Sequence, residues 1–361
     1  MTNNFNGRRG VVALVLACML VLAGCGATGP QSTEPEAPRV FPPPPAAPAY
    51  QFERSVFEAN DLANQGADSG FLTLLVGAKR GGGKGLSRPL ALAAHQGRVA
   101  VINALDSSLS VFDFAQRQFF SVDLSAQGGQ RMPVGISVDR SGNWYVADGL
   151  SGYVLVLDAQ GRELRKLGGS RWLRKLINVA VDSDRQRVYA VDQTEGQHRV
   201  RVFNAVTGSH LMDIGNGGEG PGEFDRPLDA AVGQDGRLYV VDSGNYRIQI
   251  FDAHGQYLKS FGSAGKRPGQ FQRPKEIATD AQGLVYVTDA SFGNIQVFGP
   301  GGDYRYVIGS RGDVGAAATY MLPSGLAIDT DARLYVLDQW YVRLDVYRSV
   351  QRRAVAPLLS Q

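Results

Sequence analysis

Cysteine and histidine are scarce in this chain, and neither sign of charge dominates. Two of the 361 residues are cysteine, four are histidine, and 37 basic residues face 34 acidic ones. Both cysteines, Cys18 and Cys25, lie near the N-terminus, so we expect neither a disulfide nor a cysteine-based metal site in the remaining chain. The near-neutral charge gives no support for nucleic acid as a partner. The 45 glycines indicate many turns rather than long helices.

Residues 1–24 have the pattern of a signal peptide. Arg8 and Arg9 precede the apolar run "VVALVLACMLVLAG", which is too short and wrongly flanked for a stable membrane span. The run leads into "LAGC" (22–25), which resembles the bacterial lipobox; a plain secretory signal is the alternative. The resemblance implies lipidation of Cys25 and removal of the peptide before it. Because Gly26 follows, it also implies sorting to the outer membrane, on its periplasmic or its outer side.

Residues 25–70 are expected to form a stalk or linker between the lipidated cysteine and the folded domain. The stretch "PQSTEPEAPRVFPPPPAAP" (30–48) contains eight of the 17 prolines, and it has little apolar surface to bury. Such a composition favours an extended polyproline conformation. The following "FERSVFEANDLANQ" (52–65) is ambiguous, and one short helix is a possible interpretation.

The rest of the chain is built from a repeat. Five segments align, followed by a sixth, degenerate copy: "WYVAD" (144–148), "VYAVD" (188–192), "LYVVD" (238–242), "VYVTD" (285–289), "LYVLD" (334–338) and "VAVIN" (99–103). Their last residues lie 44 to 50 positions apart. This period, with alternating apolar runs, predicts a propeller blade of four strands, which we name a to d from the axis outwards.

The fourth copy, "PGEFDRPLDAAVGQDGRLYVVDSGNYRIQIFDAHGQYLKSFGS" (221–263), resembles an NHL repeat, and the next copy is nearly as good. The resemblance extends over residues 71–348. Six copies imply an all-β fold, a six-bladed β-propeller of four-stranded antiparallel blades. The family is functionally mixed, so the fold alone does not settle the activity.

The ring is expected to be closed by an N-terminal outer strand. Outer strands such as "ELRKLG" (163–168) resemble "FLTLLVG" (71–77), which precedes the first blade. We therefore predict that residues 71–77 complete the sixth blade and remove its open edge. The segment "AVAPLL" (354–359), within the C-terminal tail 349–361, competes for the same place.

Antiparallel strands put the d–a connections and the b–c turns on one face, which carries the longer segments and is where we expect binding. The predicted partner-binding residues are its cations and aromatic side chains: Lys79, Arg80, Lys84, Arg171, Arg174, Lys175, Lys266, Arg267, Tyr246, Phe292, Trp340 and Tyr341. Such a surface suits an acidic protein or an anionic envelope polymer. The alternative is a solvated loop face with no partner.

The histidines and the residues at the axis bear on possible metal sites. The expected strand order puts only His198 of the four histidines on this face, which argues against a three-histidine zinc site. The residues that open strand a at the axis include Asn178, Asp229 and Glu276 in three successive blades. Their oxygen atoms suit Ca²⁺, and gluconolactonase-like propellers use a comparable set. The alternative is that the acids are hydrated or paired with nearby arginines.

Asp242 ends a predicted b strand in a position that suits a catalytic carboxylate. It recurs as Asp148, Asp192, Asp289 and Asp338, so we predict five structural turn caps, not five catalytic bases. We interpret the chain as a lipid-anchored binding or scaffolding module of the bacterial cell envelope, rather than an enzyme. A calcium-dependent hydrolase or lactonase with its metal at the channel mouth is the alternative.

Overall fold

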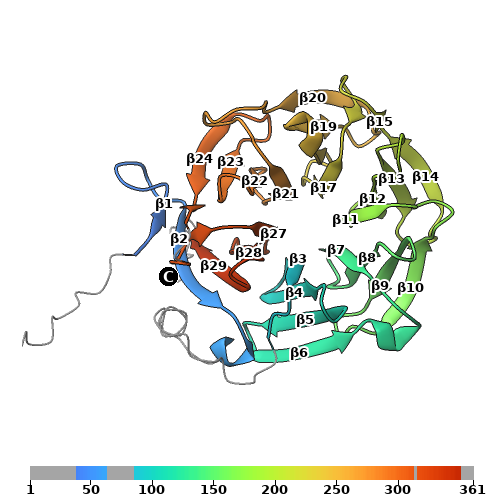
Figure 1. Ribbon diagram of the computed structural model, residues 1–361, viewed down its shortest axis with the longest axis horizontal. Helices are drawn as coiled ribbons and strands as arrows, with labels where there is room; N and C mark the ends of the chain where they lie inside the picture. The colour runs from blue at the N-terminus through green and yellow to red at the C-terminus, as the bar shows by residue number, and fades with distance from the viewer. Residues whose placement is uncertain (1–37, 63–84, 313–314, 351–361) are drawn as a thin grey trace, which may run out of the picture. The chain divides into compact units, whose positions relative to one another are not determined.

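The computed structural model describes residues 38–62, 85–312 and 315–350, and its strands belong to the unit that starts at Arg39. Six sheets stand around a central axis, each with strands ordered a to d from the axis outwards (Figure 1). Neighbouring strands within a sheet are antiparallel. The fold is an all-β six-bladed propeller, as the repeat predicted.

The first three blades follow one another in the chain. Blade 1 consists of β3 (Pro89–His95), β4 (Arg98–Asn103), β5 (Ser108–Asp113) and β6 (Gln118–Asp123). Blade 2 consists of β7 (Pro133–Val138), β8 (Trp144–Asp148), β9 (Tyr153–Leu157) and β10 (Glu163–Gly168). Blade 3 consists of β11 (Leu176–Asp182), β12 (Arg187–Asp192), β13 (Arg199–Asn204) and β14 (His210–Ile214).

The remaining blades continue this order. Blade 4 consists of β17 (Pro227–Val232), β18 (Leu238–Asp242), β19 (Arg247–Phe251) and β20 (Tyr257–Phe261). Blade 5 consists of β21 (Pro274–Thr279), β22 (Val285–Asp289), β23 (Asn294–Phe298) and β24 (Tyr304–Ile308). Blade 6 consists of β27 (Pro323–Ile328), β28 (Leu334–Asp338), β29 (Arg343–Ser349) and β2 (Tyr50–Val56), with β1 (Val40–Phe41) added outside β2.

Short elements decorate this frame. Two-stranded parallel pairs precede blades 4 and 6: β15 (Asn216–Gly217) with β16 (Glu223–Phe224), and β25 (Ser310–Arg311) with β26 (Thr319–Tyr320). Three 3-10 turns complete the described elements: η1 (Ala59–Leu62), η2 (Ser125–Gln127) and η3 (Ser243–Asn245). No helix in the described ranges is long and apolar enough to span a bilayer.

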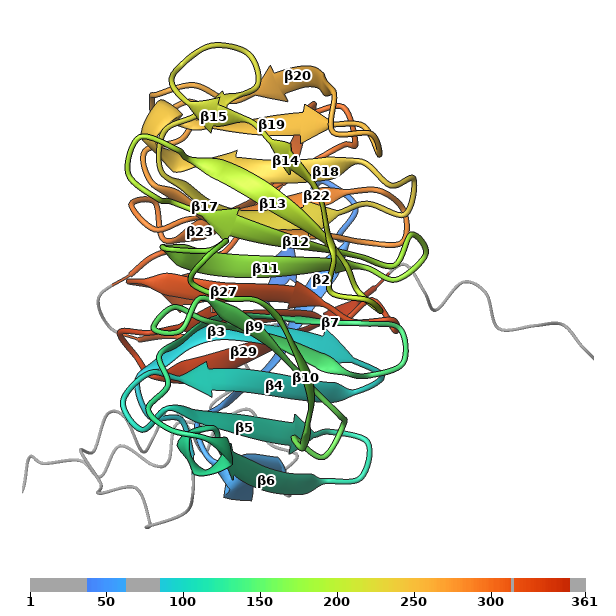
Figure 2. The ribbon, with the colours of Figure 1, turned by 90° about the vertical axis from the view of Figure 1, so that its right-hand side faces the viewer.

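The blades are held together by apolar contacts between neighbours. Seen from the rim, the sheets lie one against the next (Figure 2). Six clusters of buried side chains each join two neighbouring blades. Every residue of "LYVVD" in β18 is buried, because both faces of this strand are covered by other blades. By contrast, three of the five residues of the outer strand β20 are exposed.

The strand that closes the ring is not the one that the sequence suggested. Strand β2 (Tyr50–Val56) pairs with β29 along its length, from Tyr50–Ser349 to Val56–Leu344. It lies within residues 25–70, which were expected to form a linker. Its residues form a strand, whereas the sequence suggested one short helix as a possible interpretation of 52–65. The two segments proposed for this place, 71–77 and 354–359, lie outside the described residues. The expectation of an N-terminal outer strand is confirmed, but its position was wrong.

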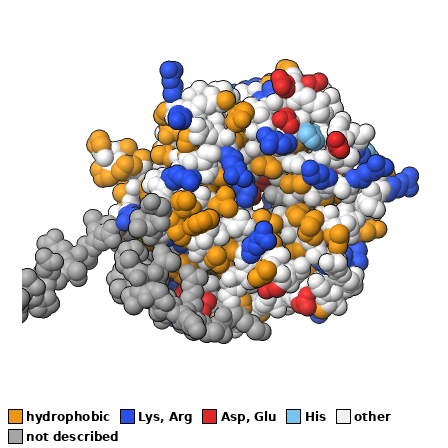
Figure 3. Space-filling model, viewed as in Figure 1, with side chains coloured by type: hydrophobic (Ala, Val, Ile, Leu, Met, Phe, Trp, Pro, Cys, Tyr) orange, Lys and Arg blue, Asp and Glu red, His pale blue; other side chains and the backbone are white. Residues whose placement is uncertain are grey.

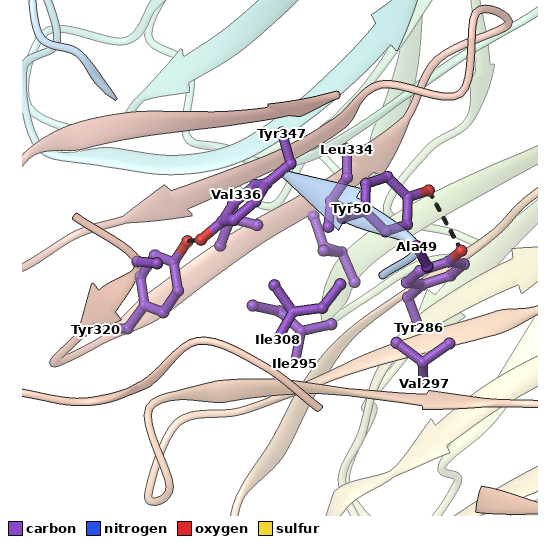
Figure 4. Close-up of a cluster of buried hydrophobic side chains, with 12 residues drawn as sticks. Ala49, Tyr50, Tyr286, Ile295, Val297, Ile308, Tyr320, Leu334, Val336 and Tyr347 are labelled. Carbon is purple, nitrogen blue, oxygen red and sulfur yellow. Dashed lines mark hydrogen bonds between the residues drawn. The ribbon is translucent and has the colours of Figure 1, made fainter. Parts of the chain in front are cut away.

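Burial explains why Tyr50–Val56 takes this place. Tyr50 and Val56, at its two ends, are 3% and 0% exposed, and burying such side chains stabilises the fold by about 2 kcal/mol each. Figure 4 shows Tyr50 packed between blades 5 and 6, where its hydroxyl lies 3.3 Å from that of Tyr286. The hydroxyl groups of Tyr320 and Tyr347 form a hydrogen bond in the same cluster. The closing strand therefore completes both a sheet and a core.

Candidate functional site

The d–a connections and b–c turns lie on one face of the ring, which we call the loop face. The structure describes four d–a connections in full: 124–132, 169–175, 215–226 and 262–273. It describes a fifth, 309–322, without residues 313–314. The opposite face, which we call the turn face, carries a–b and c–d turns of two to five residues. Figure 3 shows one end of the ring, with Lys and Arg side chains around the central opening and hydrophobic side chains between them.

The predicted partner-binding residues fall into three groups. Lys79, Arg80 and Lys84 lie outside the described residues. Seven are exposed on the loop face: Arg171, Arg174, Lys175, Lys266, Arg267, Tyr246 and Trp340. Phe292 and Tyr341 are half-buried, and the Tyr341 hydroxyl donates to the carbonyl of Gly312 at 2.7 Å. Most of the described part of the predicted surface is therefore accessible.

Exposed aliphatic side chains on the loop face were missed, whereas Trp340 was predicted. Leu105, Leu150 and Trp340 are 72%, 54% and 65% exposed, and each stands two residues after the last residue of its b strand. They belong to blades 1, 2 and 6, which are consecutive in the ring. Met132, 49% exposed, lies between the first two of these blades. We call these four residues the apolar arc.

The other half of the loop face carries most of its exposed cations, together with the exposed acids Glu195 and Glu219. Blades 3, 4 and 5 carry polar or small residues at the position matched to Leu105, namely Thr194, Gly244 and Ser291. The connections into these blades contribute exposed cations, which we call the basic arc: Arg171, Arg174, Lys175, Arg226, Lys266, Arg267 and Arg273.

Most of the basic arc lacks an acidic neighbour. Arg226 lies 4.0 Å from Asp225, and the Arg171 guanidinium stands over the Trp172 ring at 5.6 Å. No ion pair is recorded within the described residues for the other five cations. Their charges are therefore available to an acidic partner.

The five aspartates that end the b strands are 0% exposed, and their hydrogen bonds hold the loops of this face together. Asp289 accepts N–H groups from Gln272 and Arg273 in the preceding d–a connection (2.7 and 3.0 Å) and from Ser291 and Phe292 in the b–c turn (2.9 and 3.1 Å). Equivalent bonds reach Asp148, Asp192, Asp242 and Asp338 from their own d–a connections. Each carboxylate thus joins two loops, whereas the sequence predicted a cap of the b–c turn alone.

The residues proposed for calcium come together in the axial channel. Asn178, Asp229 and Glu276 line one cavity of about 220 Å³ between the inner strands. The Asn178 amide donates to Asp229 Oδ1 at 2.8 Å, and Asp229 also accepts the N–H groups of Ala230 (2.8 Å) and Ile277 (2.9 Å). A Cβ at Gly135 would lie 2.1 Å from Asn178 Oδ1, so this glycine makes room for the amide. The bonds join blades 3, 4 and 5.

Burial sets the ionisation of the two acids. It raises the pKa of Asp229 to about 7, against the lowering effect of its two backbone donors. Burial, and then the charge of Asp229, raises the pKa of Glu276 well above its usual range. No hydrogen bond to the Glu276 carboxyl is recorded in the described chain, whereas three N–H groups point to Asp229. Both acids therefore favour their protonated forms more than an exposed carboxyl does, and Asp229 has the donors that stabilise its charged form.

This arrangement does not fit a calcium ion well. Ca²⁺ takes about six to eight oxygen ligands. Both oxygens of Asp229 accept N–H groups, and Asn178 turns its nitrogen to Asp229 while its oxygen accepts the Val179 N–H at 2.8 Å. Within the described ranges, no three His, Cys, Asp or Glu side chains form a group that could hold a metal. The observed contacts instead suit a structural clamp at the axis.

Comparisons with known proteins agree with this architecture. A family model for the NHL repeat matches residues 224–251. The chain therefore contains an NHL repeat within a six-bladed β-propeller. No curated protein matches its sequence.

Three solved structures are similar to this propeller. One, from Bacteroides thetaiotaomicron, is a protein of unknown function with 17% identity and a TM-score of 0.57, over 74% of this chain and 71% of that one. A gluconolactonase from Xanthomonas campestris has 15% identity and a TM-score of 0.56, over 73% and 86%. Virginiamycin B lyase from Staphylococcus aureus has 12% identity and a TM-score of 0.53, over 72% and 80%. At these identities the likeness concerns the fold alone.

Proposed function

We propose that this propeller is a binding module of the bacterial cell envelope, anchored by lipid at Cys25, and that its loop face docks a protein. The observation that carries the proposal is the division of this face into an apolar arc and a basic arc. The lipobox-like "LAGC" (22–25) supports the location.

The apolar arc favours a protein over an anionic polymer. A polymer of repeated anionic units would engage the basic arc and leave Leu105, Leu150 and Trp340 in water. A protein interface combines an apolar centre with Trp, Met and Arg anchors and a polar rim, and this composition matches the loop face. The cations of the basic arc add charge complementarity to an acidic partner.

A calcium-dependent hydrolase or lactonase is the second candidate. Asn178, Asp229 and Glu276 line one channel cavity, and a gluconolactonase has a similar fold. Against this candidate stand the hydrogen bonds that already occupy Asp229. Melting with and without calcium separates the two proposals. A shift of several degrees that Asp229→Ala abolishes would support the metal site, because a bound ion stabilises only the folded state.

Site-specific photocrosslinking tests the binding proposal. A photoreactive residue at position 150 is compared with one at position 164, because Leu150 and Leu164 are similarly exposed (54% and 52%). Leu164 belongs to the outer strand β10, away from the loop face. We expect a discrete crosslinked protein from position 150 only, and its loss when Trp340 is replaced by alanine. Equal yields from both positions, together with turnover of a lactone or ester by the pure protein, would contradict the proposal.

A further inference from the structure

The d–a connections into blades 4 and 5 share one backbone frame. The pattern Pro-Gly-x-Phe-x-Arg-Pro occurs in both, starting at residues 221 and 268. In each blade a glutamine of strand c accepts an N–H group of the connection at 2.9 Å: Gln249 accepts that of Gly222, and Gln296 accepts that of Gly269. Because the two frames match, residues at the same place in the two copies can be compared directly.

The matched residues of these two connections differ in charge. The connection into blade 4 has three acids where the connection into blade 5 has a cation and two neutral side chains: Glu219, Glu223 and Asp225 correspond to Lys266, Gln270 and Gln272. A second cation, Arg267, stands where blade 4 has Gly220. The change from one blade to the next is therefore from an acidic connection to a basic one.

The b–c turn and strand c of blade 5 also lack the side chains that bind the connection in blade 4. The terminal amino group of Arg247 donates to two carbonyl groups of its connection, at 2.8 and 3.0 Å. Asn245 donates to a third at 3.0 Å. In blade 5 these two places hold Asn294 and Phe292, and no hydrogen bond from either side chain to the connection is recorded among the described residues. The place of the long arginine side chain is thus left open.

A cavity of about 300 Å³ lies along this place, at the lower end of the range for small-molecule sites. Its walls include Lys266 and Arg267 from the connection, Phe292 and Asn294 from blade 5, and Tyr304 at the start of the outer strand β24. The lining contains no acid, and no ion pair of Lys266 or Arg267 is recorded within the described ranges. Two cations without acidic partners, next to two aromatic rings, suit an anionic group that carries an apolar neighbour.

We propose that this cavity of blade 5 receives a carboxylate of the docked protein, from an acidic side chain or from a C-terminus, with the adjacent apolar group against Phe292 and Tyr304. This inference rests on the proposed function and adds the chemistry by which the partner is recognised. A cationic group is disfavoured, because Lys266 and Arg267 would repel it.

Ligand-observed NMR on the full-length protein tests the cavity with small probes. Acetyl-Asp-Phe-amide presents a side-chain carboxylate, acetyl-phenylalanine presents a terminal one, acetyl-Asn-Phe-amide is the neutral control, and inorganic phosphate is the anion without an apolar part. We expect at least one acidic probe to bind saturably, with a dissociation constant of about 1 mM, and the neutral probe to bind about tenfold more weakly. Failure of both acidic probes, equal binding of the neutral probe, or tighter binding of phosphate would overturn the proposal.

Variants assign the binding to this cavity. Lys266→Glu combined with Arg267→Gly introduces the residues that blade 4 carries in the same frame, so the variant should melt as the wild type does and lose at least about tenfold in affinity for the acidic probe. Lys266→Arg should retain binding. Arg174→Glu, which changes an exposed cation of the basic arc outside the cavity, should also leave binding unchanged. An equal loss in Arg174→Glu would contradict the assignment, because it would show a general effect of charge.

Crosslinking from position 150 separates this inference from the proposed function. If the acidic probes do not bind while that crosslink persists, the loop face docks a protein and the cavity assignment is wrong. If the acidic probes bind but position 150 gives no crosslink, the carboxylate site stands and docking of a protein by the loop face is rejected.

Discussion

Replacing Asp242 by alanine should cost stability rather than binding, and the structure gives the size of the loss. Asp242 is 0% exposed and accepts four hydrogen bonds. They come from the Asp225 N–H (2.7 Å), Asn245 Nδ2 (2.9 Å), Arg247 Nε (2.8 Å) and Gln249 Nε2 (3.1 Å). This one carboxylate therefore gathers four donors from its d–a connection, its b–c turn and strand β19.

Two of these donors lose their only recorded acceptor in the variant. Asn245, Gln249 and the terminal amino group of Arg247 keep carbonyl partners at Gly218, Glu223 and Gly220. The Asp225 N–H and Arg247 Nε do not. An orphaned donor costs about 1–3 kcal/mol, and breaking a largely buried ion pair costs about 3–5 kcal/mol. Since the Arg247 side chain is 16% exposed, we expect a total loss of about 4 kcal/mol.

Urea denaturation of the folded domain measures this loss. Asp252→Ala is the matched control, because Asp252 caps a c–d turn by accepting the N–H groups of His254 and Gln256, both at 2.8 Å. That variant should lose about 1 kcal/mol. Crosslinking from position 150 should persist in Asp242→Ala wherever the variant is folded. A loss below 1 kcal/mol, or abolished crosslinking in a fully folded variant, would refute the role of a structural cap.

Three further predictions concern pH, ring closure and anchoring. Because the pKa values of Asp229 and Glu276 are raised in the folded state, the stability that they contribute is complete below their unfolded values and is lost as pH rises towards the folded values. The shift in the pKa of Asp229 from 3.8 to about 7 corresponds to about 4 kcal/mol. The melting temperature at pH 5 should therefore exceed that at pH 8, and Glu276→Gln should reduce the difference. A melting temperature that does not change with pH in the wild type would contradict the raised pKa values. A chain that starts at residue 39 should melt as the full domain does, whereas one that starts at residue 70 lacks β2 and should lose cooperative melting; equal melting of the two would show that another segment closes the ring. Cys25→Ser should move the protein from the membrane fraction to the soluble fraction, and unchanged fractionation would exclude a lipid anchor.

The sequence predicts the blades well because each copy repeats the same constraints. Strands such as "LYVVD" (238–242) are buried on both faces, and the aspartate at the end of each accepts an N–H group from its d–a connection, so selection for packing leaves a periodic pattern. The closing strand has no such pattern. Tyr50–Val56 pairs with β29 about 290 residues away, and five of its seven residues are only half-buried, so its local sequence resembles a linker or a helix.

The binding surface was only partly predictable for a related reason. Exposed cations are visible in the d–a connections, but single leucines in turns are ordinary features of a protein surface. Trp340 was predicted as an aromatic side chain of this face, but Leu105 and Leu150 gain meaning only when the same position is compared across blades and the ring places blades 6, 1 and 2 side by side. The clamp of Asn178 and Asp229 shows the reverse case. Their residue types suggest a metal site, whereas their hydrogen bonds indicate a structural role.

The most direct test of the central claim compares crosslinking from position 150 on the loop face with crosslinking from position 164 on the rim. If the loop face docks a protein, position 150 alone should yield a discrete product, and both Trp340→Ala and reversal of the charge of Lys266 and Arg267 should diminish it. A product of equal strength from position 164, or one at position 150 that neither change affects, would contradict the proposed function.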